Sequence, residues 1–236
     1  MIELEKIYKS FGKVEALNDI SILLEPGKCY GLIGPNACGK TTMIKSILSM
    51  VMPTKGTIKV DGKNISGDVA YKMKIGYMPQ IGRYPENMSI MQVIQMIRDI
   101  RNHQGNEDME IFYSLGLDSI STKKMRTLSG GTTQKVSATL AFLFNPDILI
   151  LDEPTAGLDP LASEILREKI IKEREKGKLI IITSHLLSEL DELLTDIIFM
   201  HESKVLFNKP VSALYLETGQ EKVSKAINYL LKSTLA

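Results

Sequence analysis

A glycine-containing segment near the N-terminus carries the residue types that bind phosphate. It reads Gly-Pro-Asn-Ala-Cys-Gly-Lys-Thr and matches the pattern G-x-x-x-x-G-K-[ST]. Small residues let backbone N–H groups surround a phosphate, and a helix that begins at the loop adds positive potential. Lys40 is expected to reach the β- and γ-phosphates, and the Thr41 hydroxyl is expected to ligate Mg²⁺. The residues expected to contact the nucleotide are Gly34, Pro35, Asn36, Ala37, Cys38, Gly39, Lys40, Thr41 and Thr42.

An acidic pair, Asp152 and Glu153, follows the apolar run Asp147–Leu151. Such a run is typical of a buried strand, and the carboxyl end of a strand is where open α/β folds bind ligands. Asp152 is expected to hold Mg²⁺ through water, and Glu153 to polarise the attacking water as a general base. An acidic turn that merely ends a strand is the alternative. The phosphate loop in the same predicted sheet favours catalysis.

Alternating strands and helices would position these residues. A strand over Cys29–Ile33 precedes the phosphate loop, and a helix over Thr41–Met50 follows it. Other predicted strands are 2–7, Val14–Leu17, Ile20–Leu24, Thr57–Val60, Asp147–Leu151, Lys178–Thr183 and Asp196–Met200, and further helices are Ala162–Glu175 and Leu186–Leu194. The pattern predicts an α/β fold whose first 80 residues are rich in short strands.

The middle of the chain is helical instead. Apolar residues recur at three- and four-residue spacing from Ile90 to Ile100, with Asn87 or Ser89 as the cap. A second short helix is predicted over Met109–Leu115. We therefore expect a helical subdomain over 85–135 inserted in the α/β core, and one amphipathic helix in the tail.

Composition limits the classes of protein that the chain can be. The chain has 236 residues, with 29 basic and 28 acidic side chains and a net charge of +1, which argues against binding nucleic acid by bulk positive potential. No apolar run approaches the roughly 18–20 residues that span a bilayer, and the N-terminus lacks a signal-peptide core. Two cysteines fit a reducing cytosol. A soluble, intracellular globular protein is expected.

Five further segments carry a family resemblance. They are Ser10-Phe11-Gly12-Lys13, Tyr77-Met78-Pro79-Gln80, Leu128-Ser129-Gly130-Gly131-Thr132, Gly157-Leu158-Asp159-Pro160 and Thr183-Ser184-His185. With the phosphate loop and the acidic pair, they resemble the motifs of ATP-binding-cassette (ABC) ATPases in their usual order, over essentially the whole chain. The resemblance implies a P-loop NTPase core, a mixed sheet flanked by helices, with an antiparallel β subdomain and an inserted α-helical subdomain. The single ABC ATPase domain would comprise a core at 1–84 and 136–208, a helical subdomain at 85–135 and a tail at 209–236.

The resemblance also implies roles for these residues, with ATP and Mg²⁺ as ligands. Gln80 would contact Mg²⁺ and the lytic water, and His185 the γ-phosphate. The Phe11 ring would stack on adenine, although it could equally be a core residue. The signature residues Ser129, Gly130 and Gly131, together with Asp159, would act at the ATP of a second ATPase subunit, in a homo- or heterodimer that sandwiches two ATP molecules.

Several positions depart from the family pattern. Ala37 stands where glycine is usual, which would cost about 1 kcal/mol if the position needs a positive φ. Cys38 replaces a small residue, and its thiol is either a space-filler or a reactive group whose modification by maleimide would block ATP binding. Thr132 and Lys135 replace the usual Gln and Arg of the signature segment. Because Glu153 and His185 are both present, we still expect an active ATPase.

The compact form is similar to the separate ATPase subunits of bacterial exporters with ABC-2-type membrane subunits. Residues 129–191 also resemble ATPases of copper-processing systems that mature nitrous-oxide reductase. Integral membrane subunits would dock near Gln80 and residues 81–85, where Tyr84 is either an apolar anchor or an exposed loop aromatic. The protein would then be cytoplasmic and peripheral on the inner face of the membrane. A soluble non-transport ABC ATPase and a weakly hydrolysing regulatory module are the alternatives, and no nucleic-acid partner is expected.

Overall fold

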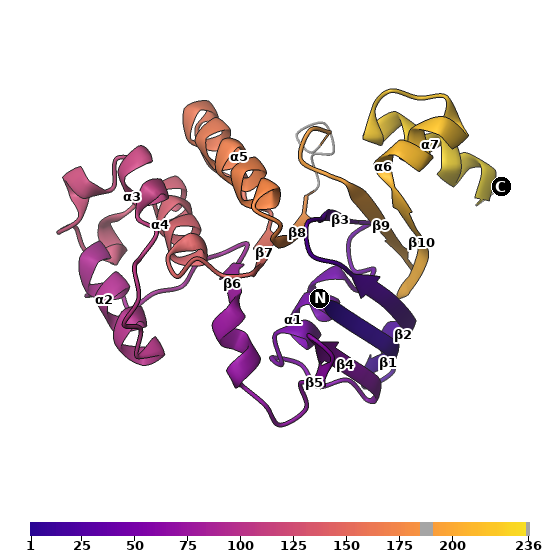
Figure 1. Ribbon diagram of the computed structural model, residues 1–236, viewed down its shortest axis with the longest axis horizontal. Helices are drawn as coiled ribbons and strands as arrows, with labels where there is room; N and C mark the ends of the chain where they lie inside the picture. The colour runs from indigo at the N-terminus through magenta and orange to yellow at the C-terminus, as the bar shows by residue number, and fades with distance from the viewer. Residues whose placement is uncertain (185–190, 235–236) are drawn as a thin grey trace. The chain divides into compact units, whose positions relative to one another are not determined.

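The computed structural model describes residues 1–184 and 191–234, which belong to two compact units (Figure 1). The first unit comprises residues 1–72 and 179–236, and the second comprises 73–178. These limits differ from the helical subdomain predicted at 85–135, whose bounds stay a prediction. The predicted α/β class with an antiparallel sheet and inserted helices is confirmed.

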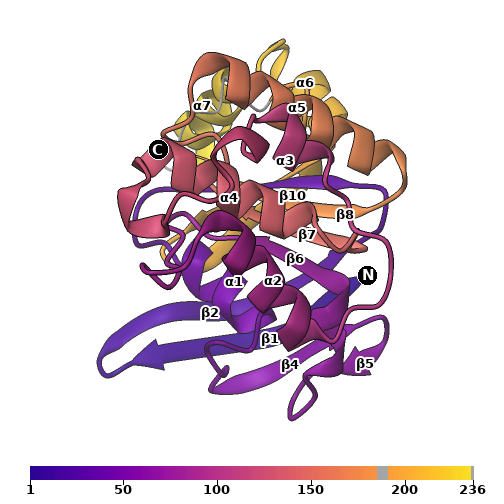
Figure 2. The same cartoon turned by 90° about the vertical axis from the view of Figure 1, so that its left-hand side faces the viewer.

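An antiparallel sheet opens the first unit. It is built from β1 (Ile2–Phe11), β2 (Val14–Leu24), β4 (Lys55–Val60) and β5 (Lys63–Asn64), in the order β2-β1-β4-β5 (Figure 2). The buried residues of β1 are Ile2, Leu4 and Ile7, and an irregularity at Lys6, with a φ of 49°, shifts the alternation between Leu4 and Ile7. The two segments predicted over residues 14–24 form one continuous strand, β2.

A mostly parallel group of strands carries the phosphate loop in the same unit. β3 (Cys29–Ile33) pairs in parallel with β8 (Leu179–Thr183) on one side and β9 (Asp196–His201) on the other, and β10 (Lys204–Pro210) adds antiparallel to β9. Every residue of β3 and β8 is buried. α1 (Lys40–Ile47) follows the loop. The apolar runs in the sequence thus mark strands that are covered on both faces.

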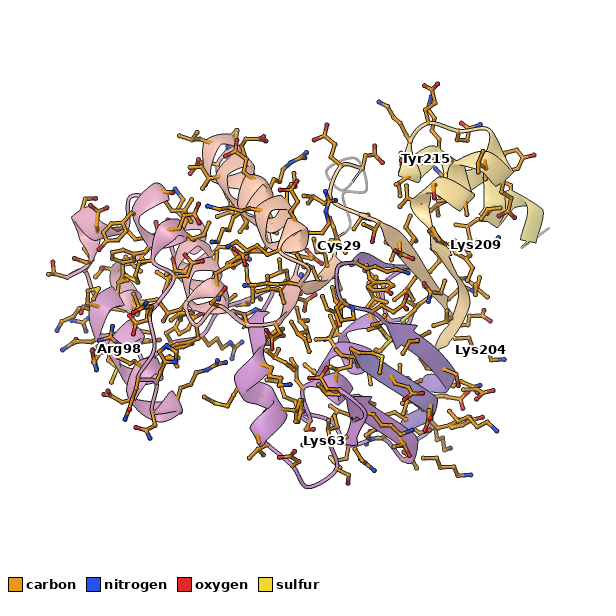
Figure 3. The ribbon with its side chains drawn as sticks, in the orientation of Figure 1. Cys29, Lys63, Arg98, Lys204, Lys209 and Tyr215 are labelled. Atoms are coloured by element: carbon orange, nitrogen blue, oxygen red, sulfur yellow. The ribbon has the colours of Figure 1, made fainter. Side chains whose placement is uncertain are left out.

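The C-terminal part differs from the single helix predicted from sequence. β10 carries Lys204 and Lys209 (Figure 3), and two helices follow it, α6 (Val211–Thr218) and α7 (Val223–Thr234). The predicted apolar face of the tail is that of α7, on which Val223 and Ala226 are fully buried. Most of the helix predicted over Leu186–Leu194 lies outside the described residues.

The second unit combines a strand pair with helices. β6 (Ile75–Met78) and β7 (Ile148–Asp152) run parallel, and the helices are α2 (Ile90–Arg101), α3 (Glu110–Ser114), α4 (Gly130–Phe142) and α5 (Pro160–Glu175), with 3₁₀ turns at Asp118–Ile120 and Met125–Thr127. A further 3₁₀ turn, Ala70–Lys74, begins in the first unit and ends in the second. Ser89 caps α2 through a reciprocal pair of hydrogen bonds with Gln92. In the described residues no helix combines the length and the apolarity needed to cross a membrane.

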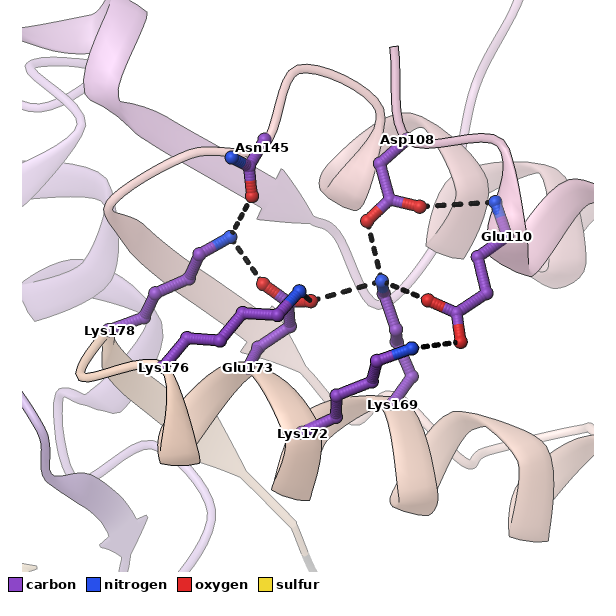
Figure 4. Close-up of polar contacts among 8 residues, drawn as sticks. All are labelled: Asp108, Glu110, Asn145, Lys169, Lys172, Glu173, Lys176 and Lys178. Carbon is purple, nitrogen blue, oxygen red and sulfur yellow. Dashed lines mark hydrogen bonds and ion pairs between the residues drawn. The ribbon is translucent and has the colours of Figure 1, made fainter. Parts of the chain in front are cut away.

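A buried ammonium group joins α5 to the segment around α3 (Figure 4). Lys169 Nζ lies 2.5 Å from Asp108, 2.7 Å from Glu110 and 3.0 Å from Glu173, and its side chain is 2% exposed. Burial alone would lower the pKa of Lys169, but hydrogen bonds to these carboxylates outweigh burial and raise the pKa. The ion pairs therefore tie together residues that are far apart in the sequence.

Glu173 is the most deeply buried carboxylate of this group, with no exposed side-chain surface. Burial would raise its pKa, but hydrogen bonds from Lys176, Lys178 and Lys169 lower the pKa to about 2. Lys178 also donates to the Asn145 side chain, 2.6 Å away (Figure 4). Each charge in the group thus faces an opposite charge, which compensates for the loss of water.

Candidate functional site

Two glycines of the phosphate loop lie where no side chain fits. A Cβ at Gly34 would lie 2.1 Å from the Met200 carbonyl oxygen, and a Cβ at Gly39 would lie 2.3 Å from the Ala16 carbonyl oxygen. Gly39 also begins α1 with a φ of 106°. Within the loop, the Cys38 N–H donates to the Pro35 carbonyl oxygen at 3.4 Å, so the backbone between β3 and α1 curls ahead of a helix N-terminus. This geometry fits phosphate groups, which backbone N–H groups and the helix dipole would bind.

Ala37 has a φ of 62°. The position thus has the left-handed conformation that glycine adopts without strain, and alanine carries a cost of about 1–2 kcal/mol there. Cys38 is buried, and its Sγ lies 2.8 Å from where a Gly34 Cβ would be. The thiol therefore fills space inside the loop, in agreement with the packing role considered from sequence.

Lys40 lies across the loop that precedes it. Its Nζ donates hydrogen bonds to the carbonyl oxygens of Gly34, at 2.7 Å, and Pro35, at 2.9 Å. Thr41 is exposed on the first turn of α1. The Lys40 ammonium group is thus held next to the loop backbone. An anion bound to the loop N–H groups would lie close enough to pair with it.

Two other predicted nucleotide contacts belong to the first unit. The register of β3 with β8 pairs Leu32 with Thr183, so the segment that leads to His185 leaves the sheet beside the phosphate loop. His185 itself lies outside the described residues. The Phe11 ring is 50% exposed in the β1–β2 turn, and Lys9 Nζ lies 5.1 Å from its centroid. Phe11 is therefore not a core residue, and its ring is open to a stacking partner.

The acidic pair and Gln80 share an edge of the second unit. The register of β6 with β7 pairs Met78 with Leu151, so Gln80, which follows β6, and Asp152, which ends β7, lie at the same edge. Asp152 is buried, and Gln80 is exposed. Burial and the nearby Asp152 carboxylate raise the pKa of Tyr77 to about 12. The negative charge of Asp152 thus lies close to the strand that leads to Gln80.

Glu153 has an unusual backbone conformation, with a φ of 52°. Its carbonyl oxygen accepts hydrogen bonds from the Ala156 N–H, at 3.1 Å, and from Gln134 Nε2, at 3.4 Å. Left-handed φ values are uncommon in residues other than glycine and cluster at functional sites. The turn after β7 therefore sets the direction in which the Glu153 carboxylate leaves the strand.

Ser129 caps α4, the helix that follows the signature segment. Its Oγ accepts a hydrogen bond from the Thr132 N–H at 3.2 Å, and the Thr132 hydroxyl lies 2.9 Å from the same atom. The threonine that departs from the family pattern thus holds the Ser129 side chain. Ser129 and Gly130 are exposed at the helix N-terminus, which is the end of a helix that attracts anions.

The first turns of α4 contact the loop that precedes α5. A Cβ at Gly131 would lie 2.6 Å from the Gly157 carbonyl oxygen, so the close approach requires glycine. Lys135 Nζ forms an ion pair with Asp159 at 2.7 Å, which lowers the pKa of that carboxyl. Asp159 also caps α5 by accepting from the Ala162 N–H. The signature segment and the Asp159 loop are therefore parts of one contact.

The segment after Gln80 packs against the same helix. The Tyr84 hydroxyl donates to Ser137 Oγ at 2.9 Å, and a Cβ at Gly82 would lie 2.2 Å from that oxygen. Tyr84 is thus engaged with α4 rather than free to anchor a partner. Ile81, whose side chain is 69% exposed, is the open apolar residue of this segment.

The predicted residues are divided between the two units. The phosphate loop and Phe11 belong to the first, whereas Gln80, Asp152, Glu153, the signature segment and Asp159 belong to the second. The Mg²⁺ ligands predicted from sequence, Thr41, Gln80 and Asp152, therefore come from both units. Across residues 1–184 and 191–234, no group of three or more His, Cys, Asp and Glu side chains gathers as a metal site.

Known proteins identify the family. Residues 17–156 match the family described as ABC transporter. The chain belongs to this family. Among ABC relatives, the lantibiotic transport ATP-binding protein SrtF of Streptococcus pyogenes is 32% identical over 210 residues, covering 89% of the chain and 90% of SrtF. The ABC transporter ATP-binding protein NatA of Bacillus subtilis is 30% identical over 229 residues, covering 94% of the chain and 91% of NatA.

Longer ABC proteins contain a similar segment. The human phospholipid-transporting ATPase ABCA3 is 34% identical over 203 residues, which are 84% of the chain and 12% of ABCA3. A solved ATP-binding subunit of an ABC transporter aligns over 98% of the chain and 99% of its own, with a TM-score of 0.86 at 23% identity. The dimeric, post-hydrolysis cassette MJ0796 has a TM-score of 0.79 at 21% identity, and the alignment covers 89% of the chain and 99% of the cassette. The chain is an ABC transporter ATPase domain with the fold of these cassettes.

Proposed function

We propose that this ABC ATPase drives export through a separate membrane subunit. The observation that carries its ATP-binding part is the curled loop between β3 and α1. Gly34 and Gly39 have no room there for a Cβ, and the Lys40 ammonium group bonds back to the loop. Export is supported by the names of relatives, which include a lantibiotic transport protein and Nod factor export proteins. The relatives handle unlike molecules, so the proposal does not extend to one substrate.

We infer ATP hydrolysis from the chemistry of the polar residues that the motifs supply. Loop N–H groups and Lys40 bind the phosphates, while Phe11 stacks on the adenine ring and His185 contacts the γ-phosphate. Asp152, Gln80 and the Thr41 hydroxyl would hold Mg²⁺, which would supply positive charge to offset that of the phosphate oxygens. Glu153 takes a proton from the water that attacks the γ-phosphate.

A second ATPase subunit completes each site in this proposal. The exposed N-terminus of α4, with Ser129, Gly130 and Gly131, presents N–H groups and a positive helix end to the γ-phosphate of the other subunit. Asp159 follows on the loop in contact with that helix. The dimeric MJ0796 cassette supports this arrangement. The partner is either a second copy of the chain or a related ATPase.

The membrane subunit would bind near Gln80 and Ile81. Ile81 offers an exposed apolar side chain beside a segment that Tyr84 fastens to α4. The protein would then lie at the inner face of the cell membrane, where cytoplasmic ATP reaches it. No nucleic-acid partner is proposed, since the basic and acidic side chains nearly balance.

Replacing Lys40 with alanine tests the nucleotide site. We expect ATP affinity to fall by roughly 10- to 100-fold, because hydrogen bonds to charged groups contribute about 1.5–3 kcal/mol, and we expect hydrolysis to be lost with it. Calorimetric titration with ATP measures the affinity. Lys45→Ala removes an exposed lysine from the same helix and should leave affinity unchanged. Equal affinity in the wild type and the Lys40→Ala protein would refute the proposed phosphate site.

Co-purification tests the membrane partner. A tagged chain should recover an integral membrane protein from detergent-solubilised membranes, because the exposed Ile81 segment is proposed to bind it. Ile81→Asp should reduce recovery, whereas Ile100→Asp, at a residue 72% exposed on α2, should not. Mass spectrometry of the recovered proteins gives the measurement. Recovery of ribosomes or nucleic acid without a membrane protein would instead support a soluble, non-transport ATPase.

A further inference from the structure

Gln134 lies on the face of α4 that contacts the loop 153–159. Together with Gly131 and Lys135 it occupies positions i, i+3 and i+4, which share one side of a helix. Gly131 meets the Gly157 carbonyl, Gln134 meets the Glu153 carbonyl, and Lys135 meets the Asp159 carboxylate. The start of α4 therefore contacts this loop at Glu153, Gly157 and Asp159.

Gln134 is buried at 5% exposure, which is unusual for an amide side chain. Its Nε2 donates a hydrogen bond to the Glu153 carbonyl oxygen. A buried amide is kept in place by such a bond because an unmade one costs about 1–3 kcal/mol. The contact is thus a fixed feature of the packing between α4 and the turn after β7.

The backbone of Glu153 needs support of this kind. Its φ of 52° is strained for a residue with a side chain, and such strain persists only where surrounding contacts maintain it. The Ala156 N–H supplies one bond to the Glu153 carbonyl from within the turn, and Gln134 supplies another from α4. Rotation of this peptide would swing the Glu153 carboxylate away from the end of β7.

We propose that Gln134 is a positioning residue for hydrolysis, which holds the Glu153 peptide so that its carboxylate faces the attacking water. The inference rests on the proposed role of Glu153 as the general base. It also links the base to the signature segment, since α4 carries both Ser129 at its cap and Gln134 in its second turn. Nucleotide binding, which uses the loop after β3, does not depend on Gln134.

Gln134→Leu removes the donor and puts a slightly shorter, apolar side chain in the buried position. We expect kcat to fall by roughly 10- to 100-fold, the range that displacement of a catalytic group produces, with the KM for ATP unchanged. In the nucleotide-free protein, amide hydrogen exchange should quicken in segment 153–159. In a Glu153→Gln background, Gln134→Leu should have no further effect on the residual rate, because its target is already removed.

Thr139→Val is the matched control. Thr139 is fully buried on α4, and its hydroxyl donates to the Lys135 carbonyl oxygen of its own helix rather than to the loop 153–159. The Thr139→Val protein should have the kcat of the wild type and the same rate of amide hydrogen exchange in segment 153–159. Unchanged kcat in Gln134→Leu, or an equal loss in both Glu153 backgrounds, would overturn the positioning role while leaving the Glu153 proposal intact. Wild-type turnover in Glu153→Gln alone would overturn both.

Discussion

Glu153→Gln should slow ATP turnover by about 10²- to 10⁴-fold, the contribution typical of a positioned general base. The amide keeps the size of the side chain but cannot accept the proton of the attacking water. ATP affinity should stay within about threefold of wild type, because the phosphate loop and Lys40 are untouched. Phosphate release at saturating ATP measures the rate, and calorimetric titration measures the affinity.

The same variant tests the proposed dimer. With hydrolysis blocked, ATP bound between two subunits should persist, so Glu153→Gln should elute as a dimer in ATP and as a monomer without it. Glu164→Gln is the matched control, since Glu164 is a 62% exposed carboxylate on α5. It should turn over ATP at the wild-type rate. A Glu153→Gln protein that remains monomeric in ATP would speak against the sandwich of two subunits.

Lys169→Met should lower the free energy of unfolding by about 3–5 kcal/mol, the cost of breaking a buried ion pair by removing one partner. Methionine fills the space of the lysine stem but leaves the Asp108 and Glu110 carboxylates without their buried cation. Glu173, which has no exposed side-chain surface, would keep only Lys176 and Lys178 among these lysines. Urea unfolding followed by circular dichroism gives the change in free energy.

Lys172→Met is the comparison for this prediction. Lys172 lies on the same helix and pairs with Glu110 at 2.7 Å, but its side chain is 53% exposed. Exposed pairs contribute about 0–1 kcal/mol, so this variant should unfold near the wild-type urea concentration. If both variants lose the same stability, burial of Lys169 does not set the strength of its ion pairs.

Sequence patterns predicted the features that depend on residues close together in the chain. Strand β3 has the predicted bounds Cys29–Ile33, because a fully apolar run before a glycine loop admits few alternatives. The Ser89 cap was one of two candidates, and the capping box with Gln92 decides between them. The motif residues of the second unit also come together as their strands imply, with Gln80 and Asp152 at one edge.

Features that depend on pairing at a distance were not predictable. β10 has no fully buried residue and shows no apolar alternation; it is a strand because its backbone pairs with β9, so sequence alone did not mark it. The contact of Gln134 with Glu153 and that of Lys169 with Asp108 join segments that no periodicity relates. The positive φ of Glu153 had no signal either, because glycine is the residue that normally reveals such a position.

Ala37 gives the phosphate loop a property that glycine would not. Compared with glycine, an alanine in the left-handed region strains the folded loop, but it also lowers the conformational entropy of the unfolded chain. Alanine and glycine codons differ by a single base, so one mutational step exchanges a stiffer loop for a looser one. Such a step would change the stability of the loop while leaving its backbone N–H groups, which are the groups proposed to bind phosphate, unchanged.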